Sequence, residues 1–217
     1  MKNILCFGDS NTWGYIPKAD RTLPNTRYPF DIRWTGVAQK ELGPEYRLIE
    51  EALNGRTTVF NDPVEPNRNG LACLDMIMDS QSPLDLVIVF LGCNDTKEHF
   101  SSTAPIIAQG LRVIVEQILK SSYGPNGSAP KVLVVPPAPI HPNIENTWMI
   151  TYFNKQSVEK ASQLPALYED VAKQYGVGYL NAALYATPSE EDGLHLYPES
   201  HEKLGKAFAK KIKDMLG

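Results

Sequence analysis

Residues 84–91 read LDLVIVFL, a stretch that is apolar almost throughout and rich in branched side chains. A strand with one face in solvent alternates apolar and polar residues, whereas a strand covered on both faces is apolar without interruption. The stretch therefore predicts a buried strand of a parallel sheet. Directly after it comes Gly92-Cys93-Asn94-Asp95, a small polar turn at the point where the strand should end.

Shorter apolar runs predict four further strands, at 3–7 (NILCF), 46–50 (YRLIE), 131–135 (KVLVV) and 177–180 (VGYL). Helical patterns separate the strands and close the chain, at 31–43, 70–80, 105–121, 151–175 and 198–216. Within 151–175, Pro165 is expected to break a helix or to start one. Alternating strands and helices predict an α/β protein with a parallel sheet and helices on both of its faces. Because no shift of composition marks a boundary, we expect a single domain over residues 1–217.

Composition and charge exclude several classes of protein. The formal net charge is −4 and there is no tract rich in Lys and Arg, so a nucleic-acid partner is not expected. No apolar run approaches the ~18 residues of a membrane helix, and residues 4–7 are too few for the apolar core of a signal peptide. Three cysteines without a CxxC pair indicate reduced thiols. We therefore expect a cytoplasmic protein that does not enter a membrane.

Polar turns follow three of the predicted strands, and a fourth precedes the last helix. They are Gly8-Asp9-Ser10-Asn11, Leu53-Asn54-Gly55-Arg56-Thr57, Gly92-Cys93-Asn94-Asp95 and Asp192-Gly193-Leu194-His195. In an open parallel sheet, ligands bind beyond the carboxyl ends of the strands. The four turns are therefore expected to meet at one edge of the sheet.

These turns contain the groups that acyl transfer needs: a nucleophile, a base, a group that orients the base, and donors for the oxyanion. Ser10 is the candidate nucleophile, His195 the base, and Asp192 the carboxylate that fixes the imidazole tautomer. The oxyanion donors would be the backbone N–H groups of Ser10 and Gly55 and the side-chain amide of Asn94.

Each of these residues also has a purely structural interpretation. Ser10 could cap a helix, Gly55 could serve only a turn, and Asn94 could form an Asx turn. Other histidines compete with His195 for the role of the base. His99 could line the pocket, His141 lies in a proline-rich loop, and His201 is expected to be a solvated surface residue. No HExxH pattern or paired ligand spacing is present, so no metal is expected.

The walls of the substrate pocket are expected among the neighbours of these residues. Trp13 or Tyr15 could wall the acyl group, Leu194 adjoins His195, and Lys97 is expected at the rim. Asp9 is expected to brace the turn around Ser10. The same turns add further candidate pocket residues: Asn11, Asn54 and Cys93.

At these four blocks the chain resembles the SGNH hydrolase superfamily, also called the GDSL family of esterases and lipases. The residues for which the superfamily is named match Ser10 in GDSN, Gly55 in LNGRT, Asn94 in GCND and His195 in DGLH. Asn11 departs from the usual leucine. Longer stretches, such as GDSNTWGY and LDLVIVFLGCNDTK, are similar to bacterial aryl esterases with acyltransferase activity.

The resemblance implies a flavodoxin-like, three-layer α/β/α sandwich with a five-stranded parallel sheet and no metal or organic cofactor. It implies hydrolysis of small acyl esters through an acyl-enzyme, with transfer of the acyl group to alcohols when water is excluded. It also implies a homo-oligomer in which loops such as 15–30 and 136–150 narrow the entrance to the site.

Other functions remain open from the sequence. The same triad serves carbohydrate O-deacetylases, lysophospholipases and thioesterases. A different class is a non-catalytic module that binds a flavin-like small molecule at the crevice of a flavodoxin-like sheet.

Overall fold

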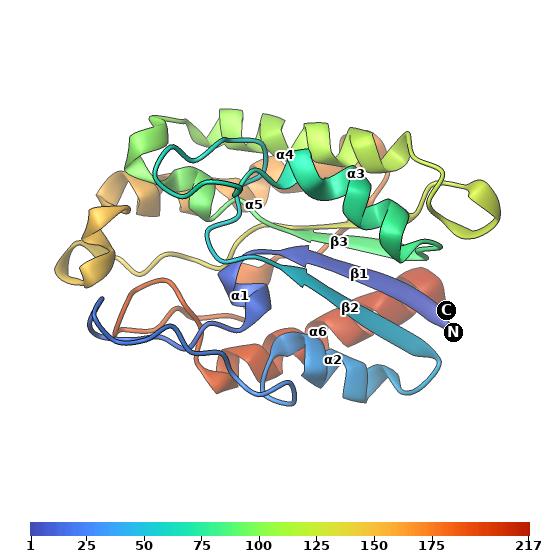
Figure 1. The fold of residues 1–217 in the computed structure, drawn as a ribbon, viewed down its shortest axis with the longest axis horizontal. Helices are drawn as coiled ribbons and strands as arrows, with labels where there is room; N and C mark the ends of the chain where they lie inside the picture. Colours follow the sequence, from blue (N-terminus) through green and yellow to red (C-terminus); the bar gives the residue numbers. More distant parts are fainter.

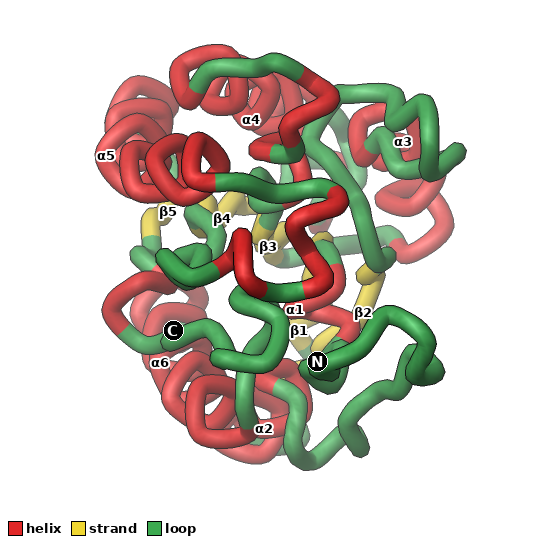
Figure 2. Tube along the Cα trace, turned by 90° about the vertical axis from the view of Figure 1, so that its left-hand side faces the viewer, coloured by secondary structure: helices red, strands yellow, loops and turns green.

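A sheet of five parallel strands forms the centre of the computed structural model, which describes residues 1–217. The strands are β1 (Lys2–Gly8), β2 (Tyr46–Ala52), β3 (Leu86–Phe90), β4 (Lys131–Val135) and β5 (Gly178–Tyr179). Their order is β2-β1-β3-β4-β5, and Figure 2 shows it along the sheet, viewed from the carboxyl ends of the strands. This is the flavodoxin-like order, so the predicted fold class is confirmed.

Helices cover both faces of the sheet (Figure 1). They are α1 (Ser10–Trp13), α2 (Trp34–Leu42), α3 (Gly70–Gln81), α4 (Ala104–Leu119), α5 (Lys155–Tyr175) and α6 (Pro198–Leu216). Helices α3, α4 and α5 pack on one face, while α2 and α6 pack on the other. No helix combines the length and the apolar character that a membrane span requires.

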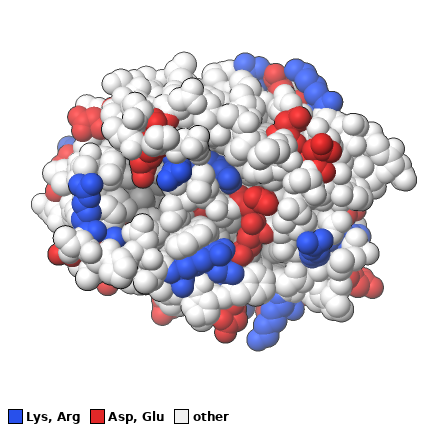
Figure 3. All heavy atoms as spheres, viewed as in Figure 1, with Lys and Arg blue, Asp and Glu red and all other residues white.

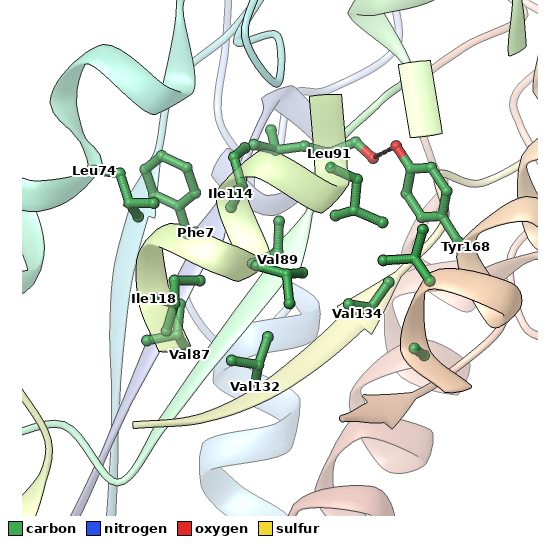
Figure 4. Close-up of a cluster of buried hydrophobic side chains, with 14 of the residues drawn as sticks. Phe7, Leu74, Val87, Val89, Leu91, Ile114, Ile118, Val132, Val134 and Tyr168 are labelled. Atoms are coloured by element: carbon green, nitrogen blue, oxygen red, sulfur yellow. Dashed lines mark hydrogen bonds between the residues drawn. The ribbon is translucent and has the colours of Figure 1, made fainter. Parts of the chain in front are cut away.

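The larger of the two cores lies beneath α3, α4 and α5 (Figure 4). Val87 and Val89 of β3 point into it, and Ile114 and Ile118 of α4 meet them from above. At its edge the hydroxyl of Tyr168 donates a hydrogen bond to the carbonyl of Leu91, 3.1 Å away. This bond satisfies a buried phenol and joins α5 to the end of β3.

The second core explains why β3 is apolar at every position. Ile88 and Phe90, which alternate with the valines of β3, pack against α2 and α6. There the rings of Trp34 and Phe208 stack with their centroids 4.1 Å apart. Because both faces of β3 are covered, the uninterrupted apolar run at its centre is what the fold requires.

Two predicted helices differ from the structure. Helix α2 begins at Trp34 instead of residue 31, because the N–H groups of Ile32 and Arg33 first close a turn on the carbonyl of Pro29. The prediction that Pro165 breaks or starts a helix is wrong, since α5 begins at Lys155 instead of residue 151 and runs unbroken through Pro165. The buried residues Leu164 and Tyr168 hold the helix on the sheet on either side of the missing N–H.

The fifth strand is shorter than predicted. Only Gly178 and Tyr179 pair with β4, at Leu133 and Val134, and the chain then turns away after Leu180. At this edge of the sheet, a short strand limits the exposed backbone that another chain could pair with.

We expect Phe208→Ala to lower the free energy of unfolding by about 3–5 kcal/mol, because it removes a fully buried ring that stacks on Trp34. Urea denaturation measures the loss. The matched control is Met76→Ala on α3, whose side chain is 69% exposed, and it should change stability by about 0.5 kcal/mol or less. Equal effects of the two substitutions would contradict the assigned core.

Candidate active site

A sharp turn between β1 and α1 presents Ser10 at the carboxyl edge of the sheet. The carboxylate of Asp9 caps α1 by accepting a hydrogen bond of 3.0 Å from the N–H of Asn11. A Cβ atom at Gly8 would lie 2.1 Å from the hydroxyl of Thr12, so only glycine allows the helix to fold back this closely. The turn therefore holds Ser10 rigidly, and Asp9 braces it as the sequence predicts.

A continuous line of hydrogen bonds joins Ser10 to His195 and Asp192. Nε2 of His195 lies 3.0 Å from Oγ of Ser10, and its Nδ1 lies 2.7 Å from Oδ2 of Asp192. All three side chains are buried. The other oxygen of Asp192 accepts the backbone N–H groups of Leu194 and His195, at 3.0 and 2.9 Å. The carboxylate thus fixes both the imidazole and the turn that carries it.

The environment of Asp192 keeps its carboxyl ionised. Burial opposes ionisation, but the side-chain hydrogen bond and the charge of His195, with the two backbone N–H groups, outweigh it and lower the pKa of Asp192 to about 2. A carboxylate that stays charged suits the role of orienting an imidazole and stabilising its protonated form.

The ring of Tyr15 stacks on the imidazole of His195, with centroids 4.1 Å apart and planes 22° from parallel. Its hydroxyl donates a hydrogen bond of 2.6 Å to the side-chain oxygen of Asn25. Burial, with the nearby charge of Asp192, raises the pKa of Tyr15 to about 12. Tyr15 is therefore a neutral wall that holds the imidazole from one side.

The three predicted oxyanion donors line one cavity. The N–H groups of Ser10 and Gly55 donate no hydrogen bond within the protein. Gly55 has φ +79°, a left-handed conformation that favours glycine. One amide hydrogen of Asn94 is held by the carbonyl of Arg56 at 3.1 Å, which fixes the amide and leaves its second hydrogen for a ligand.

The segment that follows β3 ties the turn around Gly55 in place. Asp95 accepts hydrogen bonds from the N–H of Thr58, at 2.9 Å, and from its hydroxyl. Lys97 forms ion pairs with Asp62, at 3.0 Å, and with Glu65. These contacts join residues 94–97 to residues 56–65 at several points.

The predicted position of Lys97 at the rim is wrong. Its side chain is 2% exposed, because Asp62 and Glu65 compensate its charge inside the protein. His99 does not line the cavity, since its Nε2 lies beside Oδ1 of Asp62 at 3.3 Å. The carboxylate of Asp62 thus contacts both Lys97 and His99.

The cavity next to Ser10 has a volume of about 270 Å³. Eight of the predicted site residues line it: Ser10, Tyr15, Asn54, Gly55, Asn94, Lys97, Leu194 and His195. Eight further lining residues were not named from the sequence: Lys18, Arg21, Asn25, Glu65, Trp148, Met149, Tyr152 and Phe153. Five of these belong to loops 15–30 and 136–150: Lys18, Arg21, Asn25, Trp148 and Met149. These are the two loops that the resemblance implies at the entrance to the site, and this implication is the signal that points to them.

Four residues expected in the pocket do not line it: Asp9, Asn11, Trp13 and Cys93. The carboxylate of Asp9 is used to cap α1. The guanidinium carbon of Arg27 lies over the ring of Trp13, 5.2 Å from the ring centroid. Cys93 packs in a small apolar cluster behind the wall, with Leu194 and Phe153. The amide of Asn11 donates to the carbonyl of Leu194 at 3.4 Å and so links the Ser10 turn to the His195 turn.

The prediction that His201 is a solvated surface residue is wrong. It is fully buried, and its Nδ1 accepts the N–H of Trp34 at 3.3 Å. Burial, with the charges of His195 and Arg33, lowers the pKa of His201 to about 4. His201 is therefore a neutral link between α6 and α2.

The fourth histidine, His141, does not act through its ring at this site. Its backbone N–H donates a hydrogen bond of 2.8 Å to the carbonyl of Gly193, in the turn before His195.

The model of the GDSL-like lipase/acylhydrolase family matches residues 6–203. Among solved structures, the chain is similar to an aryl esterase of M. smegmatis, with 38% identity, a TM-score of 0.93 and both chains covered over 100% of their length. It is also similar to Est24, a carbohydrate acetylesterase from Sinorhizobium meliloti, with 39% identity, a TM-score of 0.90 and full coverage of both chains. No match was found among curated proteins.

We expect the stability of the protein to fall as the pH drops from about 4 towards 2, in part through Asp192. Its pKa is lowered from 3.8 to about 2 in the folded state, so its ionisation contributes stability that is complete above the unfolded pKa and is lost on acidification. This contribution is roughly 2 kcal/mol. Urea denaturation at pH 2 to 6 should show a shallower acid loss in Asp192→Asn than in the wild type.

The matched control for this measurement is Asp214→Asn, near the exposed end of α6. Its acid profile should follow that of the wild type. Parallel profiles for the wild type and Asp192→Asn would contradict the assigned ionisation of Asp192.

Proposed function

The chain belongs to the GDSL-like lipase/acylhydrolase family, and on that premise we propose that it is a serine esterase that hydrolyses small acyl esters through Ser10. Membership of this family and full-length likeness to esterases make it a carboxylic ester hydrolase. The observation that carries the proposal is the unbroken hydrogen-bonded line from Asp192 through His195 to Ser10, which ends in a cavity.

In the first step, Oγ of Ser10 attacks the carbonyl carbon of the ester while Nε2 of His195 takes its proton. The negative charge that develops on the carbonyl oxygen is met by the N–H groups of Ser10 and Gly55 and by the amide of Asn94. Ser10 begins α1, so its N–H also carries the partial positive charge of a helix start. Collapse of the intermediate releases the alcohol, which takes the proton from His195.

In the second step, His195 removes a proton from water, which attacks the acyl-enzyme. His195 then returns this proton to Oγ of Ser10 as the carboxylic acid leaves. An alcohol bound in place of that water would receive the acyl group by the same proton transfers. Acyl transfer is therefore part of the proposal, with the balance set by how much water the cavity admits.

A small acyl group is favoured by the size of the cavity, whose volume of about 270 Å³ lies just below the usual range for ligand pockets. Tyr15, Phe153 and Leu194 supply bulky walls. The likeness to an aryl esterase agrees with a small acyl group on an aromatic alcohol.

A second candidate, a carbohydrate O-deacetylase, is favoured by a different feature of the same cavity. Trp148 and Tyr152 provide ring faces, while Asn25, Asn54 and Glu65 provide polar groups for hydroxyls. The likeness to a carbohydrate acetylesterase supports it. Both candidates use the same acyl-enzyme and differ in the alcohol.

Labelling with a sulfonyl fluoride, followed by mass spectrometry, should place the adduct on Ser10. We expect Ser10→Ala to abolish labelling and to lower kcat by about 10⁴-fold or more, because triad residues act as a unit. The matched control is Ser189→Ala, which removes a hydrogen-bond partner of Asp192 but no proposed nucleophile, and it should still be labelled. An adduct on another serine would refute the mechanism.

Rates on p-nitrophenyl esters of increasing chain length should be highest for acetate or propionate and fall steeply by octanoate. The physical reason is that the small cavity, walled by Tyr15 and Phe153, would leave much of a long chain in solvent. Steady-state kcat/KM for each ester measures this. A maximum at eight carbons or beyond would rule out the small-acyl proposal and leave the acyl-enzyme mechanism intact.

A further inference from the structure

Four charged side chains line the cavity beside Ser10: Lys18, Arg21, Glu65 and Lys97. Lys97 is paired with Glu65 and Asp62, so its charge is compensated within the protein. Neither Lys18 nor Arg21 has a carboxylate within ion-pair distance. Lys18 and Arg21 therefore bring two positive charges without an ion-pair partner to the cavity. The exposed carboxylate of Asp20, which accepts hydrogen bonds from Thr22, interacts with Lys18 only at longer range.

Lys18 is the more buried of the two, with 9% of its surface exposed. Its ammonium donates to neutral acceptors, the carbonyls of Arg21 and Leu23, at 3.3 and 2.5 Å, and the side-chain oxygen of Asn25, at 2.9 Å. The rings of Trp148 and Tyr15 lie 5.3 and 5.9 Å away and weaken its charge only in part. A charge removed from water in this way is stabilised by a nearby anion.

Lys18 has no N–H donor left for a ligand, because all three already donate within the protein, but Arg21 has free donors. Its guanidinium makes no hydrogen bond within the protein, although its carbonyl accepts from Lys18 and so fixes the two residues side by side. A free guanidinium presents a planar pair of N–H donors that fits a carboxylate. Because Arg21 is exposed while Ser10 is 6% exposed, Arg21 lies towards the mouth of the cavity.

The carboxylates of the site are already held by other partners. Asp62 and Glu65 share one lysine there, and Asp192 lies behind His195. An anionic group is disfavoured beside these carboxylates and favoured beside Lys18 and Arg21. In Figure 3, Lys and Arg atoms lie on both sides of the hollow at the left of the view, and Asp and Glu atoms lie at its upper edge.

We propose that Lys18 and Arg21 bind a carboxylate on the alcohol part of the ester, so that the preferred substrates are small acyl esters of hydroxy acids. The inference rests on the proposed esterase function and adds the substrate class. The neutral acyl group lies at Ser10, and the carboxylate lies at the mouth, where Arg21 donates to it and Lys18 supplies a nearby positive charge. Hydrolysis releases the small carboxylic acid and the free hydroxy acid.

The test compares 4-acetoxybenzoate with 4-acetoxybenzamide, which has the same shape and no charge. For each protein, the ratio of kcat/KM for the anionic ester to that for the neutral ester is determined at low salt. Intrinsic reactivities of the two esters are the same for every variant, so they cancel when these ratios are compared. The variants are Arg21→Gln and Arg21→Glu, and the control is Lys203→Gln on the exposed face of α6.

We expect the ratio to fall about fivefold in Arg21→Gln, because one exposed charge contact is lost, and further in Arg21→Glu, because the charge is reversed. In the wild type, the ratio should also fall as salt rises from 0.02 to 0.5 M, since salt screens the attraction. Lys203→Gln should keep the wild-type ratio.

An equal ratio in the wild type, Arg21→Gln and Arg21→Glu would overturn the inference. So would an equal drop in Lys203→Gln, because the effect would then come from net charge. Both results leave the esterase proposal standing as long as the neutral ester is hydrolysed. Failure of the wild type to hydrolyse either ester would instead refute the esterase proposal itself.

Discussion

Parallel pairing of the five strands is the constraint on which the site depends. Since every strand runs in the same direction, the turns that follow β1, β2 and β3 all emerge at one edge of the sheet. Ser10, Gly55 and Asn94 lie 45 and 39 residues apart along the chain and still line one cavity. The turn before α6 brings His195 to the same edge and closes the group. An antiparallel neighbour of β1 would have carried its following turn to the opposite edge.

Meeting at one edge of the sheet does not by itself fix the positions of the site residues. Contacts made by the segment that follows β3 hold the turn around Gly55 in place. Asn94, Asp95 and Lys97 each bind a different point of the chain between residues 56 and 65. Glu65, held by Lys97, lies directly against Gly55, since a Cβ atom there would be 3.0 Å from its carboxylate. The ion pair of Lys97 and Glu65 thus packs against the turn that carries the N–H of Gly55. A donor held in place before reaction needs no reorganisation when the oxyanion forms.

The strands and the main site residues could be predicted because each leaves a signal within a few residues of sequence. The signal is an apolar run for a strand, and a small polar turn directly after it for a site residue. Residues whose environment depends on distant partners could not be placed in this way. Lys97 looks like a rim lysine until Asp62 and Glu65 are known to lie beside it, and His201 looks solvated until α2 is known to cover it. Pro165 was expected to interrupt a helix because local chemistry says so, whereas packing on the sheet outweighs one missing hydrogen bond. The single-domain, cytoplasmic and homo-oligomer expectations stay predictions.

Contacts in the loop after α1 connect the proposed base to the charges at the mouth. Tyr15 stacks on His195 and donates to Asn25, and the same oxygen of Asn25 accepts from Lys18. Lys18 in turn holds the carbonyl of Arg21. An anion bound at Lys18 and Arg21 would therefore rest on the residues that support one face of the imidazole. Recognition of the alcohol part and positioning of the base therefore depend on the same few contacts.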